Sequence, residues 1–168
     1  MARITLKGTP FETAGTLPAP GSQAPDFRLV DGDMNDVTLA TYQGKKKILS
    51  INPSLDTPVC AATARAFHER AAALGGAVVL VITADLPFAQ KRFCSAEGLD
   101  GVVPLSMMRS KTFAKDYGVL IQNGPLEGIT ARAIVVIDEG DRVLHSQLTP
   151  EIADEPDYDA ALAALRQR

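Results

Sequence analysis

Cys60 is the residue of this sequence best placed to do chemistry, because it stands at the start of a predicted helix. Pro58 suits the first helical position, since a proline there has no backbone N–H to lose. Thr57 is then the N-cap, and Cys60 is the third helical residue. That position favours a carboxylate, because free backbone N–H groups and the helix dipole stabilise negative charge. The same field stabilises a thiolate, which is the reactive form of cysteine.

The surroundings of Cys60 strengthen this prediction. The Thr57 hydroxyl is close enough in sequence to donate a hydrogen bond to the sulfur or to a substrate oxygen. Segment 53–60 joins a predicted strand to a helix at the strand's carboxyl end, where open α/β sheets bind their ligands. The alternative is that Cys60 is a small buried hydrophobic residue, as most free cysteines are. The nearby Pro58 and Thr57 favour the interpretation of Cys60 as a nucleophile.

The elements that would position this segment follow from the apolar pattern of the chain. Runs at 48–52 and 77–83 are predicted as strands, the second covered on both faces. Residues 58–74 and 85–96 are predicted as helices, the second with Asp85 as its N-cap and Pro87 in its first turn. There follow a strand at 102–106, a helix at 111–117, a hairpin of 133–137 with 142–147, and a helix at 157–166.

Two more hairpins are predicted near the N-terminus, on either side of the Pro/Gly-rich connector 17–21. They pair 4–6 with 11–13 and 27–30 with 36–39. The whole order predicts an α/β fold: a thioredoxin-like mixed sheet flanked by helices, with an N-terminal β-hairpin extension over residues 1–16. No repeat or low-complexity tract interrupts residues 1–168, so a single domain is expected.

Composition excludes several classes of function. The 168 residues are 46% hydrophobic and 22% charged, as in ordinary globular proteins, and the net charge of -3 gives no basic excess for nucleic acid or anionic lipid. No apolar run approaches the ~20 residues that span a membrane, and the first eight residues lack a signal peptide's apolar core. A cytoplasmic location is therefore expected, where a core of this size needs no structural disulfide.

The two cysteines do not suit a metal site. They lack a Cys-x-x-Cys spacing, and the two histidines, His68 and His145, lie in distant segments. No metal and no cofactor are expected.

The segment around Cys60 resembles a known family. The pattern Pro53-x-x-x-Thr57-x-x-Cys60 matches the peroxiredoxin signature, and the stretches PSLDTPVCA, ADLPFAQKRFC and DEPDYDAALAAL are similar to the bacterial thiol peroxidase branch. The resemblance runs over nearly the whole chain. It implies a peroxidase that reduces hydrogen peroxide and organic hydroperoxides with Cys60, is re-reduced by thioredoxin, and forms a homodimer. Thr57 would then hold the peroxide, with Pro53 shielding the site.

The resemblance also implies a role for Arg132, which matches by position an arginine on a late strand that completes the pocket. Its neighbours at 133–137 are apolar, so a cation there needs an anionic partner, which the Cys60 thiolate would supply. The alternative is an arginine that ends the strand and points to solvent. Asn52 departs from the apolar residue expected before Pro53. The expected substrate pocket is lined by Pro53, Leu55 and Val59, the last two leaving room for an alkyl group.

The resemblance makes Cys94 the resolving cysteine, which condenses with a sulfenic acid on Cys60 to give an intramolecular disulfide. This bond would close a loop of about 35 residues, worth roughly 4 kcal/mol. A disulfide needs Cα atoms about 4.4–6.8 Å apart, and residues on two helices packed on a sheet are rarely so close. We therefore expect the reduced fold to keep the sulfurs apart and part of helix 85–96 to unwind. The alternative is a buried Cys94 that never reacts.

Three other classes of function stay open. A cysteine hydrolase needs a base beside Cys60, and neither His68 nor His145 is obviously placed for it. A binding protein of thioredoxin fold is possible, since fold alone does not determine function. A disulfide oxidoreductase usually carries Cys-x-x-Cys, which is absent. Asp56 and Arg109 are expected at the surface.

Overall fold

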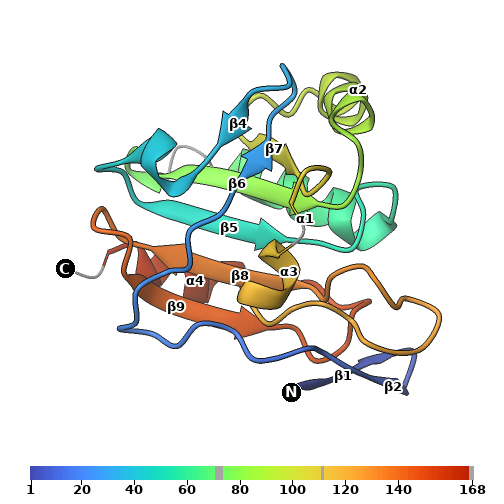
Figure 1. Ribbon diagram of the computed structural model, residues 1–168. Helices are drawn as coiled ribbons and strands as arrows, with labels where there is room; N and C mark the ends of the chain where they lie inside the picture. Colours follow the sequence, from blue (N-terminus) through green and yellow to red (C-terminus); the bar gives the residue numbers. More distant parts are fainter. Residues whose placement is uncertain (71–73, 111, 167–168) are drawn as a thin grey trace.

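The computed structural model describes residues 1–70, 74–110 and 112–166. Within these residues, seven strands form one sheet in the order β4-β3-β7-β6-β5-β8-β9 (Figure 1). Its strands are β3 (Leu29–Val30), β4 (Asp36–Val37), β5 (Lys47–Ile51), β6 (Val78–Thr83), β7 (Val103–Ser106), β8 (Ala133–Ile137) and β9 (Val143–Leu148). The mixed sheet expected from the sequence is confirmed.

The central strands bring two connections to one edge of the sheet. Strands β5, β6 and β7 are parallel, while β8 runs antiparallel to β5. Ile51, the last residue of β5, pairs with Ile82 of β6, so both strands end together. The connections 52–57 and 84–86 therefore start side by side at the carboxyl edge, the usual place for a functional site in such sheets.

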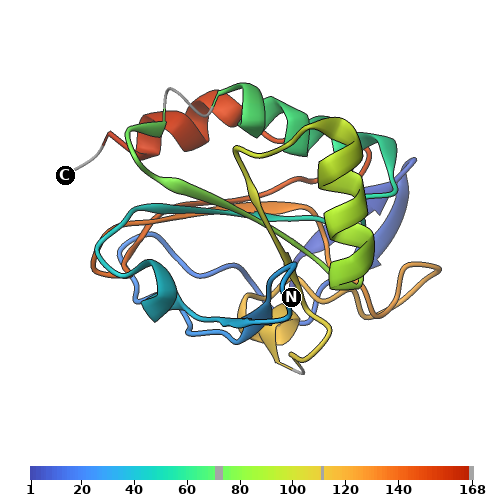
Figure 2. The ribbon, with the colours of Figure 1, turned by 90° about the horizontal axis from the view of Figure 1, so that it is seen from above.

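Helices cover both faces of the sheet, as predicted. They are η1 (Leu39–Tyr42), α1 (Pro58–Glu69), α2 (Pro87–Glu97), α3 (Phe113–Asp116) and α4 (Tyr158–Ala164). Figure 2 shows α1 and α4 along one face, with η1 and α3 on the other. Phe67 of α1 and Ala161 of α4 pack with Ile48 and Val81 of the sheet, whereas Phe113 of α3 joins the core on the opposite face.

Helix α2, which carries Cys94, is only lightly packed. Pro87 and Gln90 are its only buried residues among those the structure describes, and Phe93 and Cys94 are half-buried against the core beneath α1. Phe88 is 67% exposed. Few apolar contacts therefore oppose a local opening of this helix, since low burial accompanies low local stability.

The predicted N-terminal hairpin is present as β1 (Arg3–Leu6) and β2 (Thr9–Glu12), the second strand starting earlier than expected. The carboxylate of Glu151 fixes it to the body of the protein. It accepts hydrogen bonds from the Thr5 hydroxyl at 2.7 Å, the Lys7 N–H at 2.9 Å and the Gly8 N–H at 3.3 Å. This contact sets Leu6, at the end of β1, beside residues 152–153.

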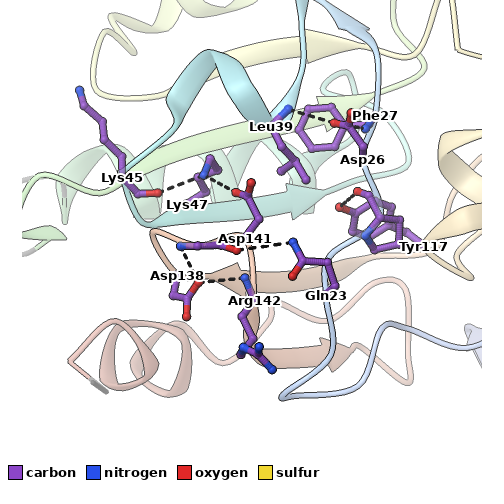
Figure 3. Close-up of polar contacts among 12 residues, drawn as sticks. Gln23, Asp26, Phe27, Leu39, Lys45, Lys47, Tyr117, Asp138, Asp141 and Arg142 are labelled. Carbon is purple, nitrogen blue, oxygen red and sulfur yellow. Dashed lines mark hydrogen bonds and ion pairs between the residues drawn. The ribbon is translucent and has the colours of Figure 1, made fainter.

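A buried ion pair closes the opposite end of the sheet (Figure 3). The Lys47 side chain is fully buried, and its Nζ atom lies 2.9 Å from Asp141 Oδ1 and 3.1 Å from the Lys45 carbonyl oxygen. Asp138 accepts backbone N–H groups of Gly140 and Arg142, both at 2.9 Å, and so shapes the β8–β9 turn. These polar contacts therefore stabilise the end of the sheet that lies opposite the edge carrying Cys60.

Some predicted boundaries were wrong. The helix expected over 58–74 ends at Glu69; residues 71–73 lie outside the described residues, as does Lys111 in the helix expected over 111–117. Leu39 begins a 3-10 helix instead of ending a strand. The N-cap of α2 is Leu86 and not Asp85, whose carboxylate bonds to residues far away in sequence. None of the described helices is long and apolar enough to cross a membrane.

Candidate active site

Cys60 occupies the helix position predicted for it. Helix α1 begins at Pro58 with Thr57 as N-cap in extended conformation, so Cys60 is the third helical residue. Its side chain is fully buried. The backbone N–H groups of the first turn and the helix dipole therefore act on the sulfur without competition from bulk water.

Arg132 is the cationic partner of this sulfur. The residue is 2% exposed, and its Nη1 atom lies 3.2 Å from Cys60 Sγ. The same nitrogen donates to Asn52 Oδ1 at 2.9 Å, and Nε donates to the Ile152 carbonyl oxygen at 3.0 Å. Three fixed contacts hold the guanidinium in one orientation. An arginine directed to solvent, the alternative reading of the sequence, is excluded.

Asn52 is a site residue that sequence reasoning missed. It is buried, and its Nδ2 atom donates to the Ser50 carbonyl oxygen at 2.9 Å and to Ser50 Oγ at 3.1 Å. These bonds turn the Oδ1 atom toward Arg132. The departure from an apolar residue at this position was the only signal in the sequence, because a polar side chain buried at a strand end requires partners.

Thr57 lies at the site but donates elsewhere than predicted. Its hydroxyl donates to the Ser54 carbonyl oxygen at 2.8 Å and makes no capping bond. A hydroxyl has one hydrogen, so the Thr57 hydroxyl that donates to Ser54 cannot also donate to the sulfur or to a substrate oxygen. It remains available as an acceptor.

A cavity of about 250 Å³ adjoins Arg132 and Thr57. Its walls are apolar and come from four segments of the chain, including the N-terminal hairpin. It is lined by Leu6, Pro53, Ser54, Thr57, Pro58, Val59, Leu126, Ile129, Arg132, Ile152 and Ala153. Pro53 and Val59 thus lie where the expected pocket places them. Leu55 does not: it is buried in the core between α1 and the sheet and is not among the residues that line the cavity.

Cys94 lies on α2, and no disulfide joins it to Cys60; both are free thiols. Partial burial raises the pKa of the Cys94 thiol. The thiol is therefore mostly protonated at neutral pH while α2 is folded. Cys94, the candidate resolving cysteine, lies within the folded helix α2.

The remaining candidates lie away from Cys60. Asp56 is exposed, and Arg109 pairs with Asp36 at 3.0 Å on the surface. His68 Nδ1 accepts the Gly101 N–H at 3.0 Å, and His145 belongs to strand β9. Over residues 1–70, 74–110 and 112–166, no group of three or more His, Cys, Asp or Glu side chains is arranged to hold a metal ion.

Comparison with known proteins agrees with this geometry. The model of the Redoxin family matches residues 19–162. A thiol peroxidase of Mycobacterium tuberculosis is 54% identical over 165 residues, which cover 98% of this chain and 99% of the relative.

Solved structures give the same result. A peroxiredoxin-like protein from Aquifex aeolicus has a TM-score of 0.92 and 37% identity, covering 99% of this chain and 96% of its own. The thiol peroxidase from Chromobacterium violaceum has a TM-score of 0.90 and 28% identity, covering 98% and 95%. The chain therefore belongs to the redoxin family, in the thiol peroxidase branch of the peroxiredoxins.

Proposed function

We propose that this peroxidase reduces hydrogen peroxide and organic hydroperoxides with the Cys60 thiolate as nucleophile. The observation that carries the proposal is the buried Arg132 guanidinium, fixed 3.2 Å from Cys60 Sγ. A fixed cation stabilises a thiolate, and it also stabilises negative charge that develops on a nearby oxygen in the transition state. The position of Cys60 at the start of α1 acts in the same direction.

Arg132 and Thr57 offer complementary contacts to a hydroperoxide. Arg132 uses Nε and Nη1 for protein contacts, whereas Nη2 has no hydrogen-bond partner among the described residues and the side chain lines the cavity. Nη2 would donate to the peroxide oxygens. The Thr57 hydroxyl, which already donates to Ser54, would accept the peroxide O–H. The terminal peroxide oxygen would then face the sulfur.

The reaction balances without an added group. The thiolate attacks the terminal oxygen, the O–O bond breaks, and Cys60 becomes a sulfenic acid while the leaving oxygen takes a proton and departs as water or an alcohol. The Cys94 thiol then attacks the sulfenic sulfur, which releases water and forms the disulfide. Two thiols of a reductant, proposed to be thioredoxin, restore Cys60 and Cys94 by exchange.

The apolar cavity supports organic hydroperoxides as substrates. Leu6, Ile129 and Ile152 bring aliphatic surface to a space of about 250 Å³ beside Arg132. Burying an alkyl group there contributes roughly 0.8 kcal/mol per CH₂, which hydrogen peroxide cannot gain.

Rapid mixing of the reduced protein with hydrogen peroxide and with an alkyl hydroperoxide tests the function. We expect oxidation of Cys60 at least about 10³-fold faster than that of a free thiol, a factor within reach of charge stabilisation and alignment together. Cys60→Ser should abolish turnover. Oxidation at the rate of a free thiol would refute the proposal. Free Cys94 after turnover, read by alkylation and mass spectrometry, would refute only the resolving role.

Three further properties are proposed for the whole chain. It forms one domain, which the shared core of the hairpin residues Ile4 and Phe11 with the main sheet supports. It acts in the cytoplasm. It forms a homodimer, for which the exposed Leu86 and Phe88 offer apolar surface. Light scattering before and after Phe88→Glu checks the dimer.

A further inference from the structure

Asp85 makes contacts that no capping role explains. It lies between β6 and α2, and its carboxylate accepts three hydrogen bonds of 2.8 Å. The donors are the Ser54 hydroxyl, the Leu55 backbone N–H and the Thr83 hydroxyl. Two of these donors belong to the loop that carries Thr57 and leads to Cys60. The carboxylate therefore bridges the two connections that leave the sheet side by side.

On one side, this bridge continues to the substrate contacts. Ser54, held by Asp85, provides the carbonyl oxygen that accepts the Thr57 hydroxyl at 2.8 Å. The Leu55 N–H bond fixes the backbone between them, while the Leu55 side chain is buried in the core. Thr57 therefore takes its orientation from a segment whose position Asp85 determines.

On the other side, the bridge continues into helix α2. The Thr83 hydroxyl donates to Asp85 and accepts from Gln90 Nε2 at 2.9 Å, and Gln90 also donates to the Leu105 carbonyl oxygen at 2.9 Å. Gln90 is one of the two buried residues of α2 and stands one helical turn before Cys94. A continuous polar chain thus runs through Thr57, Ser54, Asp85, Thr83 and Gln90.

We propose that Asp85 is a positioning residue that aligns the Cys60 loop for attack on the peroxide and couples this alignment to the folded state of α2. This inference rests on the proposed function. While Cys94 stays in its helix, the chain of bonds holds Ser54 and Thr57 in place. When α2 opens so that Cys94 reaches the sulfenic acid, the contact through Gln90 is lost and the Cys60 loop is released at the same time. Oxidation of Cys60 therefore requires the state in which this chain of hydrogen bonds is intact, and disulfide formation requires the state in which α2 is open.

Rapid mixing with peroxide separates the two steps, because sulfenic acid and disulfide form in sequence. In Asp85→Ala we expect oxidation of Cys60 to slow by about 10- to 100-fold, the loss that a displacement of about 1 Å produces. Disulfide formation should be as fast as in the parent or faster, because the hydrogen bonds to Asp85 no longer oppose the release of the Cys60 loop. The fraction of sulfinic acid at high peroxide should fall accordingly.

Asp138→Ala is the matched control. Like Asp85, Asp138 is an aspartate between two elements whose carboxylate accepts hydrogen bonds, here from two backbone N–H groups, but it lies at the opposite end of the sheet. It should keep both rates of the parent even if its melting temperature falls. Ser54→Ala removes one arm of the bridge and should slow oxidation less than Asp85→Ala. Adding it to Asp85→Ala should cost little more, since both remove the same contact.

Several outcomes would overturn the inference. They are an oxidation rate in Asp85→Ala within about twofold of the parent, equal slowing of both steps, or equal slowing in Asp138→Ala. Should Asp85→Ala fail to fold, Ser54→Ala and Asp85→Asn decide the matter, because a single amide oxygen cannot replace both carboxylate oxygens. A parent protein that reacts no faster than a free thiol would instead refute the proposed function itself.

Discussion

Asn52 and Arg132 form a buried pair in which the amide Oδ1 accepts a hydrogen bond of 2.9 Å from the guanidinium Nη1. That nitrogen also lies 3.2 Å from Cys60 Sγ. Asn52 is itself oriented by two bonds to Ser50. The guanidinium beside the sulfur is therefore held in place by Asn52, a buried side chain directly after β5, and not by solvent.

Replacing Asn52 by Leu should weaken the site through this pair. A buried hydrogen bond to a charged group contributes about 1.5–3 kcal/mol, so the free energy of unfolding should fall by about 2 kcal/mol in urea titration. Oxidation of Cys60 should also slow, by about 10-fold, because Arg132 gains freedom. An unchanged oxidation rate would show that Arg132 needs no support from Asn52.

Arg132→Lys should be far more damaging than its unchanged charge suggests. A lysine has no planar fork and cannot make the contacts to Ile152, Asn52 and Cys60 together. Loss of one donor aimed at developing charge costs about 10²–10³-fold in rate. Stopped-flow oxidation measures this loss, and a rate near that of the parent would remove Arg132 from the mechanism.

Cys94 should respond to alkaline pH through its raised pKa. A thiol whose pKa is raised on folding stabilises the fold below its ordinary pKa of 9.0, and this contribution is lost as pH rises toward the folded value. In Cys60→Ser, alkylation of Cys94 should therefore reach its midpoint at a higher pH in the native protein than in urea. Equal midpoints would mean that α2 is already open in the native state.

Glu151 should keep the N-terminal hairpin docked in acid. The Thr5 hydroxyl and then the Lys7 N–H lower its pKa from 4.5 to about 2. Its contribution is therefore present above pH 4.5 and is lost as pH falls toward 2. Hydrogen exchange of residues 3–12 tests this window, because early loss of protection near pH 4 would contradict it.

Glu151→Ala should also change substrate preference. It frees Leu6 and disturbs the segment of Ile152, both of which line the cavity. We expect KM for a bulky alkyl hydroperoxide to rise several-fold, about 3- to 10-fold for the loss of one apolar contact, with a smaller effect for hydrogen peroxide. An equal change for both substrates would indicate damage to Arg132 instead.

Asp141→Asn should lower the stability of the fold and leave the activity unchanged. It keeps the side-chain shape at a residue with φ of 64° but leaves the fully buried Lys47 ammonium without its anion. Breaking one partner of a buried pair costs about 3–5 kcal/mol. Thermal unfolding should shift accordingly, while the oxidation rate of the folded protein stays at the parent value.

Local sequence signals predicted the parts of the site that depend on neighbours along the chain. Pro58 and Thr57 define the start of α1, so the helix position of Cys60 could be read directly. The contacts of Asp85 could not be predicted in this way, because a Ser, Thr or Asp before a proline normally indicates an N-cap. Two of its three partners, Ser54 and Leu55, are brought to it by the pairing of β5 with β6, which no local pattern contains.

The cavity shows the same limit. Its aliphatic walls at Leu6, Ile129 and Ile152 come from segments that meet only in the folded chain, and each looks like an ordinary core residue in the sequence. Leu55 was misplaced for a related reason. Its backbone N–H is bonded to Asp85 and its side chain is buried in the core, and both partners come from segments distant in the sequence.

The paired strands β5 and β8 carry a buried cation near each end, with Lys47 opposite Ile137 and Arg132 next to Ala133, which pairs with Ile51. A shift of β8 by one residue against β5 would turn Arg132 to the other face of the sheet and would move the β8–β9 turn, which carries Asp141, relative to Lys47. Lys47 would lose Asp141, and Arg132 would lose Asn52 and Cys60, so two unpaired charges would be buried at once. Incorrect strand alignment during folding is thereby penalised at both ends, and the residue that serves the sulfur also specifies how the sheet assembles.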